Sequence, residues 1–355
     1  MTELYDFKTL AMEYPSILDN VLIGNGFSIE FFDNFKYGGL YDYLVKNQLL
    51  AGQELDLFQA FDTTNFELVL NSLLTAQKVN QTLIKVTDYL DERYNTIKDL
   101  LIKAVTDIHP LYKQLHNNKL AWSLNVFKKN IFTTNYDLLS YWALLRLKRK
   151  PFERNIQDGF SYRNSSDETL SFQPTTFKNN HIKLLHLHGA LHFYEDQGEI
   201  IKINSKSEDL LTEIKQMYEE KFFPIYVSEG ASEKKHSQIK NNYYLRYCFN
   251  SLFKADGGIT ILGQGLNPMY DKHLIDTIKR SKVNYIAFGV YSTETDSSQF
   301  IIESIKNHFG KLEGKELIFY DSRTFYEFTR RKSWEHSPFQ APNNNEYYPI
   351  FNEQE

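Results

Sequence analysis

The stretch NVLIGNGFSIEFF, residues 20–32, joins a short apolar run to Gly24-Asn25-Gly26 and then returns to apolar residues. The apolar run predicts a buried strand, and the glycines predict a tight turn directly after it. Ser28 is a candidate N-cap for the helix that should follow the turn. The stretch therefore predicts the strand, turn and helix that open a βα unit.

Later segments repeat this pattern. In NIFTTNYDLLSYWALLRL, residues 130–147, an apolar run meets a polar break at Thr134-Asn135, and a helix is predicted from Asp137. Further strands are predicted in HIKLLHLHG, residues 181–189, and in GGITILGQGL, residues 257–266, with helices and strands alternating afterwards. Strands with near-continuous apolar runs that alternate with helices predict an α/β fold with a mostly parallel, Rossmann-like sheet covered on both faces.

The segments between these units set the expected domain organisation. Residues 64–116 carry apolar residues at spacings of three and four and predict two long helices. FFPIYV, residues 222–227, predicts a strand, and residues 232–255 predict a helical stretch broken near Asn241. We expect one domain over residues 1–330, with a helical module at about 64–118 and an irregular insert at about 151–180, formed by short strands or a mobile loop, followed by an extended tail at 331–355.

Composition limits the classes of function. The chain has 355 residues, of which 42% are hydrophobic and 15% aromatic, so it can bury a large core. Its net charge of −5 argues against an extended contact with nucleic acid. The one cysteine, Cys248, excludes an internal disulfide and suits a reducing cytoplasm. We see no export signal and no apolar run of membrane-spanning length, and we expect a cytoplasmic protein without membrane contact.

The residues that follow the predicted strands are the candidates for chemistry, because ligands of doubly wound sheets bind outside the carboxyl ends of the strands. Taken alone, Gly-x-Gly fits an ordinary turn as well as a phosphate site, and Thr-Thr-Asn-Tyr-Asp fits a helix cap. A metal site is a further candidate, because the sequence places three histidines close together: His186, His188 and His192. We nevertheless expect no metal at these histidines.

Taken together, G-x-G-x-S, T-T-N-Y-D, L-H-G and a late G-x-G-L followed by D-x-H-L occur in this order over roughly residues 18–325. This order resembles the sirtuin-like (SIR2-like) fold of bacterial antiviral effectors, and the segments FELVLNSL and PIYVSEG…KK…I…NYYL resemble the same group. The resemblance implies an NAD+ hydrolase that releases nicotinamide and ADP-ribose and depletes NAD during phage infection. Sirtuin deacylases normally carry a four-cysteine zinc module, which one cysteine cannot build, so the resemblance implies hydrolysis rather than deacylation.

The resemblance also implies roles for single residues. Asn135 and His188 correspond to the catalytic asparagine and histidine, and Asp137 lies where a carboxylate lines the nicotinamide end. Titrating near neutrality, His188 would accept a proton from a ribose hydroxyl or from the incoming water. The residues expected to bind NAD are Gly24, Asn25, Gly26, Phe27, Ser28, Thr134, Gly263, Gly265 and Asp271.

A free NAD hydrolase would kill its host, and the proteins that this chain resembles restrain the activity through other proteins or self-assembly. We therefore expect a homo-oligomer or a partner such as a HerA-like ATPase, an Argonaute or a phage-derived activator. Aromatic residues in the segment 31–61 fit either a self-association surface or core packing. Two other functions remain open: a non-catalytic NAD or ADP-ribose sensor, which would not need both Asn135 and His188, and an ADP-ribosyltransferase.

Overall fold

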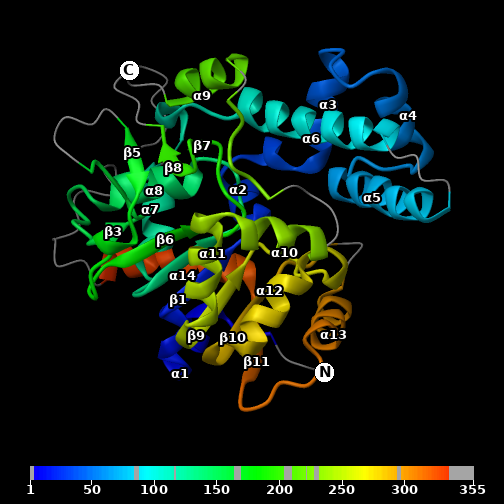
Figure 1. Cartoon of the computed structure of the whole chain (residues 1–355). Helices are drawn as coiled ribbons and strands as arrows, with labels where there is room; N and C mark the ends of the chain where they lie inside the picture. Colours follow the sequence, from blue (N-terminus) through cyan, green and yellow to red (C-terminus); the bar gives the residue numbers. More distant parts are fainter. Residues whose placement is uncertain are drawn as a thin grey trace.

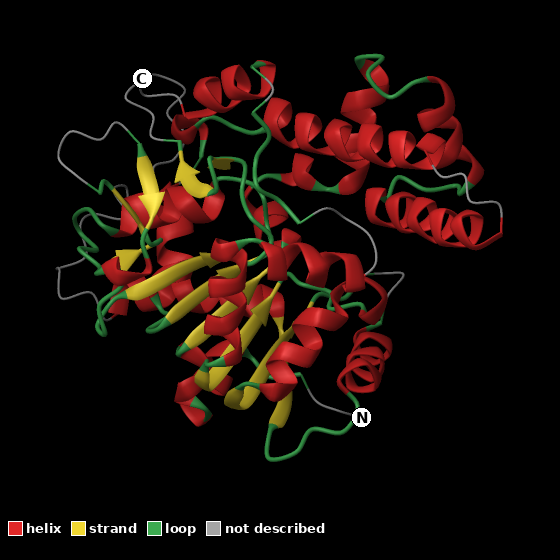
Figure 2. Cartoon of the chain, viewed as in Figure 1, coloured by secondary structure: helices red, strands yellow, loops and turns green. Residues whose placement is uncertain are grey.

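A parallel sheet forms the centre of the computed structural model, which describes residues 4–83, 88–115, 117–163, 169–203, 210–220, 222–227, 232–293 and 297–335 (Figures 1 and 2). Its strands are β1 (Asn20–Ile23), β2 (Asn130–Thr133), β3 (Ile156–Gln157), β6 (Ile182–His186), β9 (Asp256–Leu262), β10 (Lys282–Val290) and β11 (Glu316–Asp321). Within the described residues they pair in the order β11-β10-β9-β1-β2-β6-β3, and each of these pairings is parallel. The predicted α/β fold with a mostly parallel sheet is confirmed.

A second, antiparallel sheet was not predicted. It has the order β4-β5-β8-β7 and consists of β4 (Phe160–Ser161), β5 (Leu170–Phe172), β7 (Phe193–Asp196) and β8 (Glu199–Lys202). These strands are too short to show a clear alternation of polar and apolar residues. Part of the expected irregular insert, residues 164–168, lies outside the described residues. The strand predicted at 222–227 is wrong, since Tyr226 forms only an isolated bridge with Gly189.

Helices cover both faces of the central sheet. Successive strand residues point to opposite faces, so Val21 and Ile23 of β1 belong to one buried cluster and Leu22 to the other. The first face packs against α1 (Phe7–Glu13), α7 (Asn117–Asn125), α8 (Leu139–Leu147) and α14 (Ser322–Glu335). The second face packs against α10 (Ser232–Asn241), α11 (Tyr243–Phe253), α12 (Pro268–Arg280) and α13 (Ser298–Phe309). The break predicted near Asn241 separates α10 from α11.

A group of helices lies beside the carboxyl ends of the strands (Figure 1). It comprises α2 (Asn25–Phe31), α3 (Tyr37–Lys46), α4 (Gly52–Ala60), α5 (Phe66–Leu83) and α6 (Asp88–Ile108), while α9 (Leu210–Glu219) packs against α6. The two long helices predicted in residues 64–116 are α5 and α6. In α6 the buried residues Tyr94, Ile97 and Leu101 recur at helical spacing. The aromatic residues of the segment 31–61 contribute to the core, since the rings of Phe58 and Phe66 lie 4.8 Å apart.

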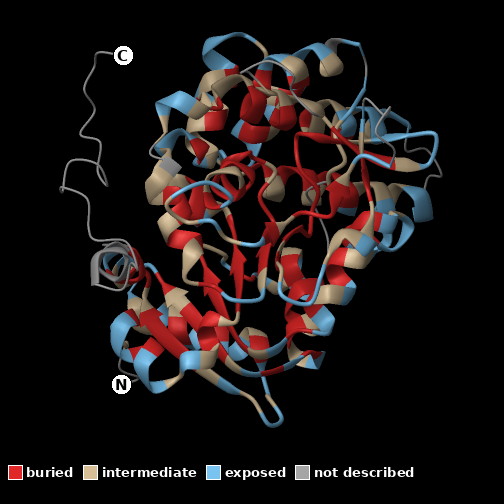
Figure 3. Ribbon diagram, turned by 90° about the vertical axis from the view of Figure 1, so that its left-hand side faces the viewer, coloured by how far each residue is buried: buried red, intermediate tan, exposed pale blue. Residues whose placement is uncertain are grey.

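The outer parts of the molecule follow from this arrangement. Figure 3 shows the buried residues along the strands and the adjoining helix faces, and the exposed residues toward the periphery. The helix α14 continues past residue 330, where an extended tail was expected to begin, and residues 336–355 lie outside the described residues. Among the described helices, none combines the length and apolarity needed to cross a bilayer.

Candidate functional site

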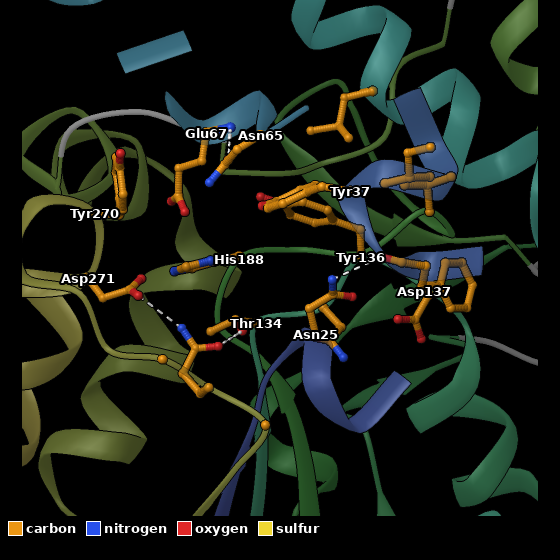
Figure 4. A pocket seen from close by; sticks show the side chains of 18 of the residues that line it. Asn25, Tyr37, Asn65, Glu67, Thr134, Tyr136, Asp137, His188, Tyr270 and Asp271 are labelled. Atoms are coloured by element: carbon orange, nitrogen blue, oxygen red, sulfur yellow. Dashed lines mark hydrogen bonds between the residues drawn. The ribbon is translucent and has the colours of Figure 1, made fainter. Parts of the chain in front are cut away.

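The topology creates a switch point between β1 and β9. The chain first builds the sheet from β1 toward β2 and β6, and later returns to the other side of β1 to add β9, β10 and β11. The connections that leave β1 and β9 therefore lead to helices on opposite faces of the sheet, and ligands of open α/β sheets bind at the carboxyl edge of such a switch point. A cavity of about 340 Å³, here called the switch-point cavity, lies at this place. Residues after β1, β2, β6 and β9 line it together with residues of α3, α5 and α6 (Figure 4).

Most of the residues singled out from the sequence meet in this cavity. Two of the four strand-end motifs contribute the residues proposed as catalytic, and the last motif contributes the opposite wall. The lining residues among those predicted are Asn25, Thr134, Asn135, Asp137, His188, Gly263, Gly265 and Asp271. Phe27 and Ser28 are instead fully buried in the helix behind the wall, and Gly26 lines a neighbouring cavity.

The glycines serve mainly to bring two backbone segments together. The Gly26 N–H donates to the Gly263 carbonyl at 2.8 Å, and the Gly24 N–H donates to the Leu262 carbonyl at 3.0 Å. A Cβ atom on Gly26 would lie 2.7 Å from the Gly263 Cα, and Gly263 itself has φ +66°. The Gly26 N–H is therefore already hydrogen-bonded to Gly263 and is not available to a phosphate. This differs from the phosphate site that the sequence offered for the Gly-x-Gly motif.

The helix after β1 also begins earlier than predicted. It starts at Asn25, with Gly24 at the N-cap and no side-chain cap, so the assignment of Ser28 as N-cap is wrong. Glycine is an accepted N-cap, and the backbone contact with Gly263 leaves no room for a side chain at this position. Ser28 lies within the first turns of α2, where its hydroxyl faces the residues that follow β2.

Asn135, Ser28 and Asp137 form a buried hydrogen-bond network. The Asn135 Nδ2 donates to the Gly24 carbonyl at 2.9 Å and to Ser28 Oγ at 2.7 Å. Because a carbonyl oxygen only accepts, these contacts fix the orientation of the amide and commit both of its N–H groups. The Asn135 side chain lines the cavity, and its oxygen Oδ1 is the atom left to accept a hydrogen bond from a ligand.

Asp137 completes the network. Its Oδ2 accepts from Ser28 Oγ at 2.5 Å, and its Oδ1 accepts from the Leu139 N–H at 2.8 Å, at the start of α8. Burial raises the pKa of the Asp137 carboxyl to about 6, and the hydrogen bonds from Ser28 and Leu139 oppose that rise. The site therefore holds a carboxyl group that is largely ionised at neutral pH at a cost in solvation.

His188 is held by a second histidine. Its Nε2 lies 2.9 Å from the Nε2 of His273 on α12, and the two rings are nearly parallel with centroids 5.2 Å apart. Burial is the main cause that lowers the pKa of His188 well below its ordinary value, and the nearby His273 and Lys235 lower it further. The prediction that His188 titrates near neutrality is therefore corrected: the imidazole is neutral at pH 7.

The opposite wall is ordered by Gln264. Its Oε1 accepts from Thr134 Oγ1 at 3.0 Å and its Nε2 donates to Asp271 Oδ2 at 3.1 Å, as the dashed lines in Figure 4 show. Asp271 interrupts the helical geometry of α12, with φ −120° and ψ 15°, and this kink lies where its side chain meets Gln264. Asp271 thus lines the cavity together with Gln264, a residue that the sequence analysis did not assign.

The sequence analysis missed several residues that line the switch-point cavity. Lys235 Nζ of α10 donates to Glu67 Oε1 of α5 at 2.6 Å, which joins two helices at the cavity, and the Lys235 side chain is only 2% exposed. Tyr37, Asn65, Tyr136 and Tyr270 also line it (Figure 4). Glu67 stands in FELVLNSL, where a charged residue beside an apolar helical face was the available signal, whereas Lys235 stands in the polar segment SEKKHSQIKN, which gave none.

A neighbouring cavity of about 810 Å³ shares the residues Gly263, Gln264 and Gly265 with the switch-point cavity. It lies at the carboxyl ends of β9, β10 and β11, between α2 and α13. Its walls combine apolar groups such as Ile301 and Ile305 with the charged side chains of Lys36 and Arg323. The two cavities together follow the carboxyl edge of the sheet on both sides of the switch point.

The other histidines lie elsewhere. The His186 ring contacts Ser140 Oγ and the Tyr244 hydroxyl, and its centroid lies 5.7 Å from that of His192. His186 and His188 therefore face different surroundings, because β6 ends at His186 and His188 lies in the turn that follows, where the same-face rule for residues two apart in a strand does not apply. Among the described residues, no group of three or more His, Cys, Asp or Glu side chains is arranged to hold a metal ion.

Comparisons with known proteins give a distant structural similarity and one family. No curated protein matches this chain. A solved structure titled "Structural Basis for the Mechanism and Regulation of Sir2 Enzymes" aligns with 92% of this chain and 97% of its own chain, at 12% identity and a TM-score of 0.36. The family described as Domain of unknown function (DUF4917) matches residues 21–326, and because that span is most of the chain, the protein belongs to this family.

Proposed function

We propose that this protein is an NAD+ glycohydrolase that cleaves the bond between nicotinamide and ribose. The observation that carries the proposal is the meeting of Asn135, Asp137 and His188 in the cavity at the switch point of the sheet. These residues follow two different strands, and their side chains offer an acceptor oxygen, a buried carboxyl group and a neutral imidazole. Such a set suits the cleavage of a glycosidic bond to a positively charged leaving group.

The chemistry would use each group in a different way. As the C1′–N bond breaks, its electron pair moves to the nicotinamide nitrogen, and positive charge develops on the ribose. The Asp137 carboxylate would stabilise this charge, and the fixed Oδ1 of Asn135 would accept a hydrogen bond from a ribose hydroxyl or from water. Water then bonds to C1′ and gives a proton to His188, which returns it to solvent, so the products are nicotinamide, ADP-ribose and a proton.

The shape of the carboxyl edge supports a dinucleotide as the substrate. The switch-point cavity would hold the nicotinamide riboside, next to Asn135 and His188. The neighbouring cavity, which adjoins it at Gly263–Gly265, would take the adenosine half. Because the Gly26 amide is bonded to Gly263, we assign the glycines to the close approach of the two loops rather than to direct phosphate contacts.

The cellular role belongs to the same proposal. The motif resemblance supports a regulated effector of antiphage defence that depletes cytoplasmic NAD when an activator or a change of oligomer releases it. The partner types in question are a HerA-like ATPase, an Argonaute, a phage-derived protein or further copies of this chain. This role rests on the motifs alone.

The test is incubation of the purified protein with NAD+, alone and with lysate of phage-infected cells, with nicotinamide and ADP-ribose followed by chromatography. We expect release by the wild type and loss of release in Asn135→Ala and His188→Ala. Asn307→Ala and His308→Ala on α13 are matched controls, since both lie outside the cavity, and they should retain activity.

Two outcomes would contradict hydrolysis. If NAD binds but stays intact under every condition, the protein is a sensor, and Asn135 and His188 are ligand contacts. If nicotinamide is released while labelled ADP-ribose stays on a macromolecule, the protein is an ADP-ribosyltransferase. Circular dichroism of each variant separates loss of chemistry from loss of folding.

A further inference from the structure

The contact between His188 and His273 restricts how the two rings can be protonated. The Nε2 atoms lie 2.9 Å apart, and a hydrogen bond at this distance needs one donor and one acceptor. Burial is the main cause that lowers the pKa of both rings, and Lys235 lowers both further, so each imidazole is neutral and carries one N–H at pH 7. One of the two Nε2 atoms therefore carries a proton and the other does not.

The second nitrogen of His188 faces open space. His188 lines the switch-point cavity, whereas His273 is not among the lining residues. In the part of the chain that the structure describes, the Nδ1 atom of His188 has no hydrogen-bond partner. Both ring nitrogens of His192 are fully buried and lack a partner among the described residues. The Nδ1 atom of His188 does not belong to this group of atoms, so it is not fully buried. The Nδ1 edge of His188 is thus the edge that a ligand in the cavity can reach.

Two proton arrangements are possible, and they give His188 opposite properties. If His188 donates from Nε2 to His273, its Nδ1 carries a lone pair and can accept a proton. If His273 donates instead, the His188 Nε2 lone pair is occupied and Nδ1 carries the proton, so the ring can only donate to a ligand. The identity of the donor therefore decides whether His188 can act as a base.

We infer that His273 is a positioning residue that accepts the Nε2–H of His188 and holds Nδ1 toward the cavity as the proton acceptor. This inference rests on the proposed function, which requires a base at this place. After Nδ1 takes a proton from the attacking water, the imidazolium still donates its Nε2–H to His273. A histidine thus takes the place of the carboxylate or carbonyl group that more often orients a catalytic histidine.

The surroundings of the pair support a fixed geometry. The Phe249 ring of α11 packs against both imidazoles, with centroids 6.5 Å from His188 and 5.6 Å from His273. Of the charged and titratable groups close to the pair, Lys235 is paired with Glu67, and His236 lies near His273. Lys235 lies near both rings and disfavours a positive charge on either of them in the resting protein, so both rings are neutral, as a hydrogen bond between the two Nε2 atoms requires.

The first test is heteronuclear NMR of protein labelled with ¹⁵N-histidine, which reports the tautomer of each ring without any substrate. His188 signals are identified by their loss in His188→Asn. We expect an unprotonated Nδ1 and a protonated Nε2 on His188 at pH 7. A protonated Nδ1 would overturn the inference, because His273 would then be the donor. This measurement decides the question even if the wild type does not hydrolyse NAD, in which case only the proposed function fails.

The second test is the kinetics of His273→Phe, which keeps a planar ring and removes both nitrogens. We expect kcat to fall roughly 10- to 100-fold, below the full 10²- to 10⁴-fold contribution of a general base, with KM nearly unchanged. The acid limb of the pH–rate profile should also shift. His273→Gln retains an acceptor oxygen and should recover part of kcat, and His308→Phe on α13 should match the wild type. Unchanged kcat and pH profile in His273→Phe would refute the positioning role.

Discussion

Replacing Asp137 by Asn tests whether the candidate site is maintained at a cost to stability. The Asp137 carboxyl is buried beside the cavity, accepts from Ser28 and Leu139, and has its pKa raised by burial from 3.8 to about 6. The amide of the variant would keep an oxygen for the Leu139 N–H and remove the buried charge. We expect Asp137→Asn to be at least as stable as the wild type at neutral pH, and to lose NAD hydrolysis.

The size of the effect follows from the pKa difference. Between pH 3.8 and 6 the folded protein holds a proton at Asp137 that the unfolded chain has released, so the free energy of unfolding decreases as pH rises through this window. At 1.36 kcal/mol per pKa unit, the cost is about 3 kcal/mol above pH 7. The same relation gives a cost at pH 8 that exceeds the cost at pH 5 by roughly 1–2 kcal/mol.

The assay is urea denaturation of both proteins at pH 5, 6, 7 and 8. The quantity compared is the difference in free energy of unfolding between Asp137→Asn and the wild type, which should grow by roughly 1–2 kcal/mol from pH 5 to pH 8 in favour of the variant. The amide nitrogen cannot accept the proton that Ser28 Oγ donates to Asp137 Oδ2, and the loss of this hydrogen bond lowers the absolute gain by about 1–2 kcal/mol at each pH and leaves this growth unaffected. Asp42→Asn, at an exposed position of α3, corrects for the removal of one negative charge.

The refuting result is a difference that stays constant, or that moves against the variant, as pH rises. Asp137 would then be ionised at little cost, for example because solvent reaches it through the cavity. Loss of hydrolysis without loss of stability, by contrast, would show that the carboxyl group serves chemistry rather than folding.

Three further predictions concern the frame of the site. Lys202→Met should lower the free energy of unfolding by about 3–5 kcal/mol, because the buried Asp158 carboxylate would lose the Lys202 ammonium group that lies 2.6 Å from it. Urea denaturation measures this change, and a loss below about 1 kcal/mol would contradict the prediction. Asn20→Ala should lower the free energy of unfolding by about 2–4 kcal/mol in the same measurement. The Asn20 side chain donates to the Asp256 and Gly258 carbonyls at 2.8 Å and accepts from Asn130 at 2.7 Å, and the variant loses these hydrogen bonds. A variant as stable as the wild type would show that water replaces them. Gly26→Ala should lower Tm, because a Cβ atom at this position would lie 2.7 Å from Gly263 Cα. Gly265→Ala should leave Tm unchanged, because a Cβ atom there meets nothing within 4 Å. Equal Tm values for the two variants would refute the role given to the close approach of Gly26 and Gly263.

Much of the fold was predictable because it follows from local pattern. The apolar runs and the helices between them were visible in the sequence, and β1, β2, β6 and β9 lie where they were expected. The antiparallel sheet was missed because strands of two to four residues leave no periodic signal. The segment at 222–227 has strand-like residues but forms only one bridge, since pairing depends on a neighbour that the local sequence does not specify.

The site was predictable as a place and less so as a set of contacts. Parallel strands bring their carboxyl ends to one edge, so Asn135 and His188 could be expected to meet once the strands were recognised. The partners that define their state come from distant parts of the chain: Ser28 and Gly24 for Asn135, and His273 for His188. The low pKa of His188 follows from burial and from those neighbours, neither of which a local motif contains.

The sequence by itself determined the alternation of strands and helices, the α/β class and the strand ends that carry polar residues, because these depend on the periodicity and turn chemistry of short segments. The tertiary structure decided which atoms meet. It brought Gly26 against Gly263, set Ser28 between Asn135 and Asp137, and faced His188 with His273. The reason is physical: hydrogen bonding, desolvation and close packing act between atoms a few ångströms apart, and only the folded chain fixes those distances.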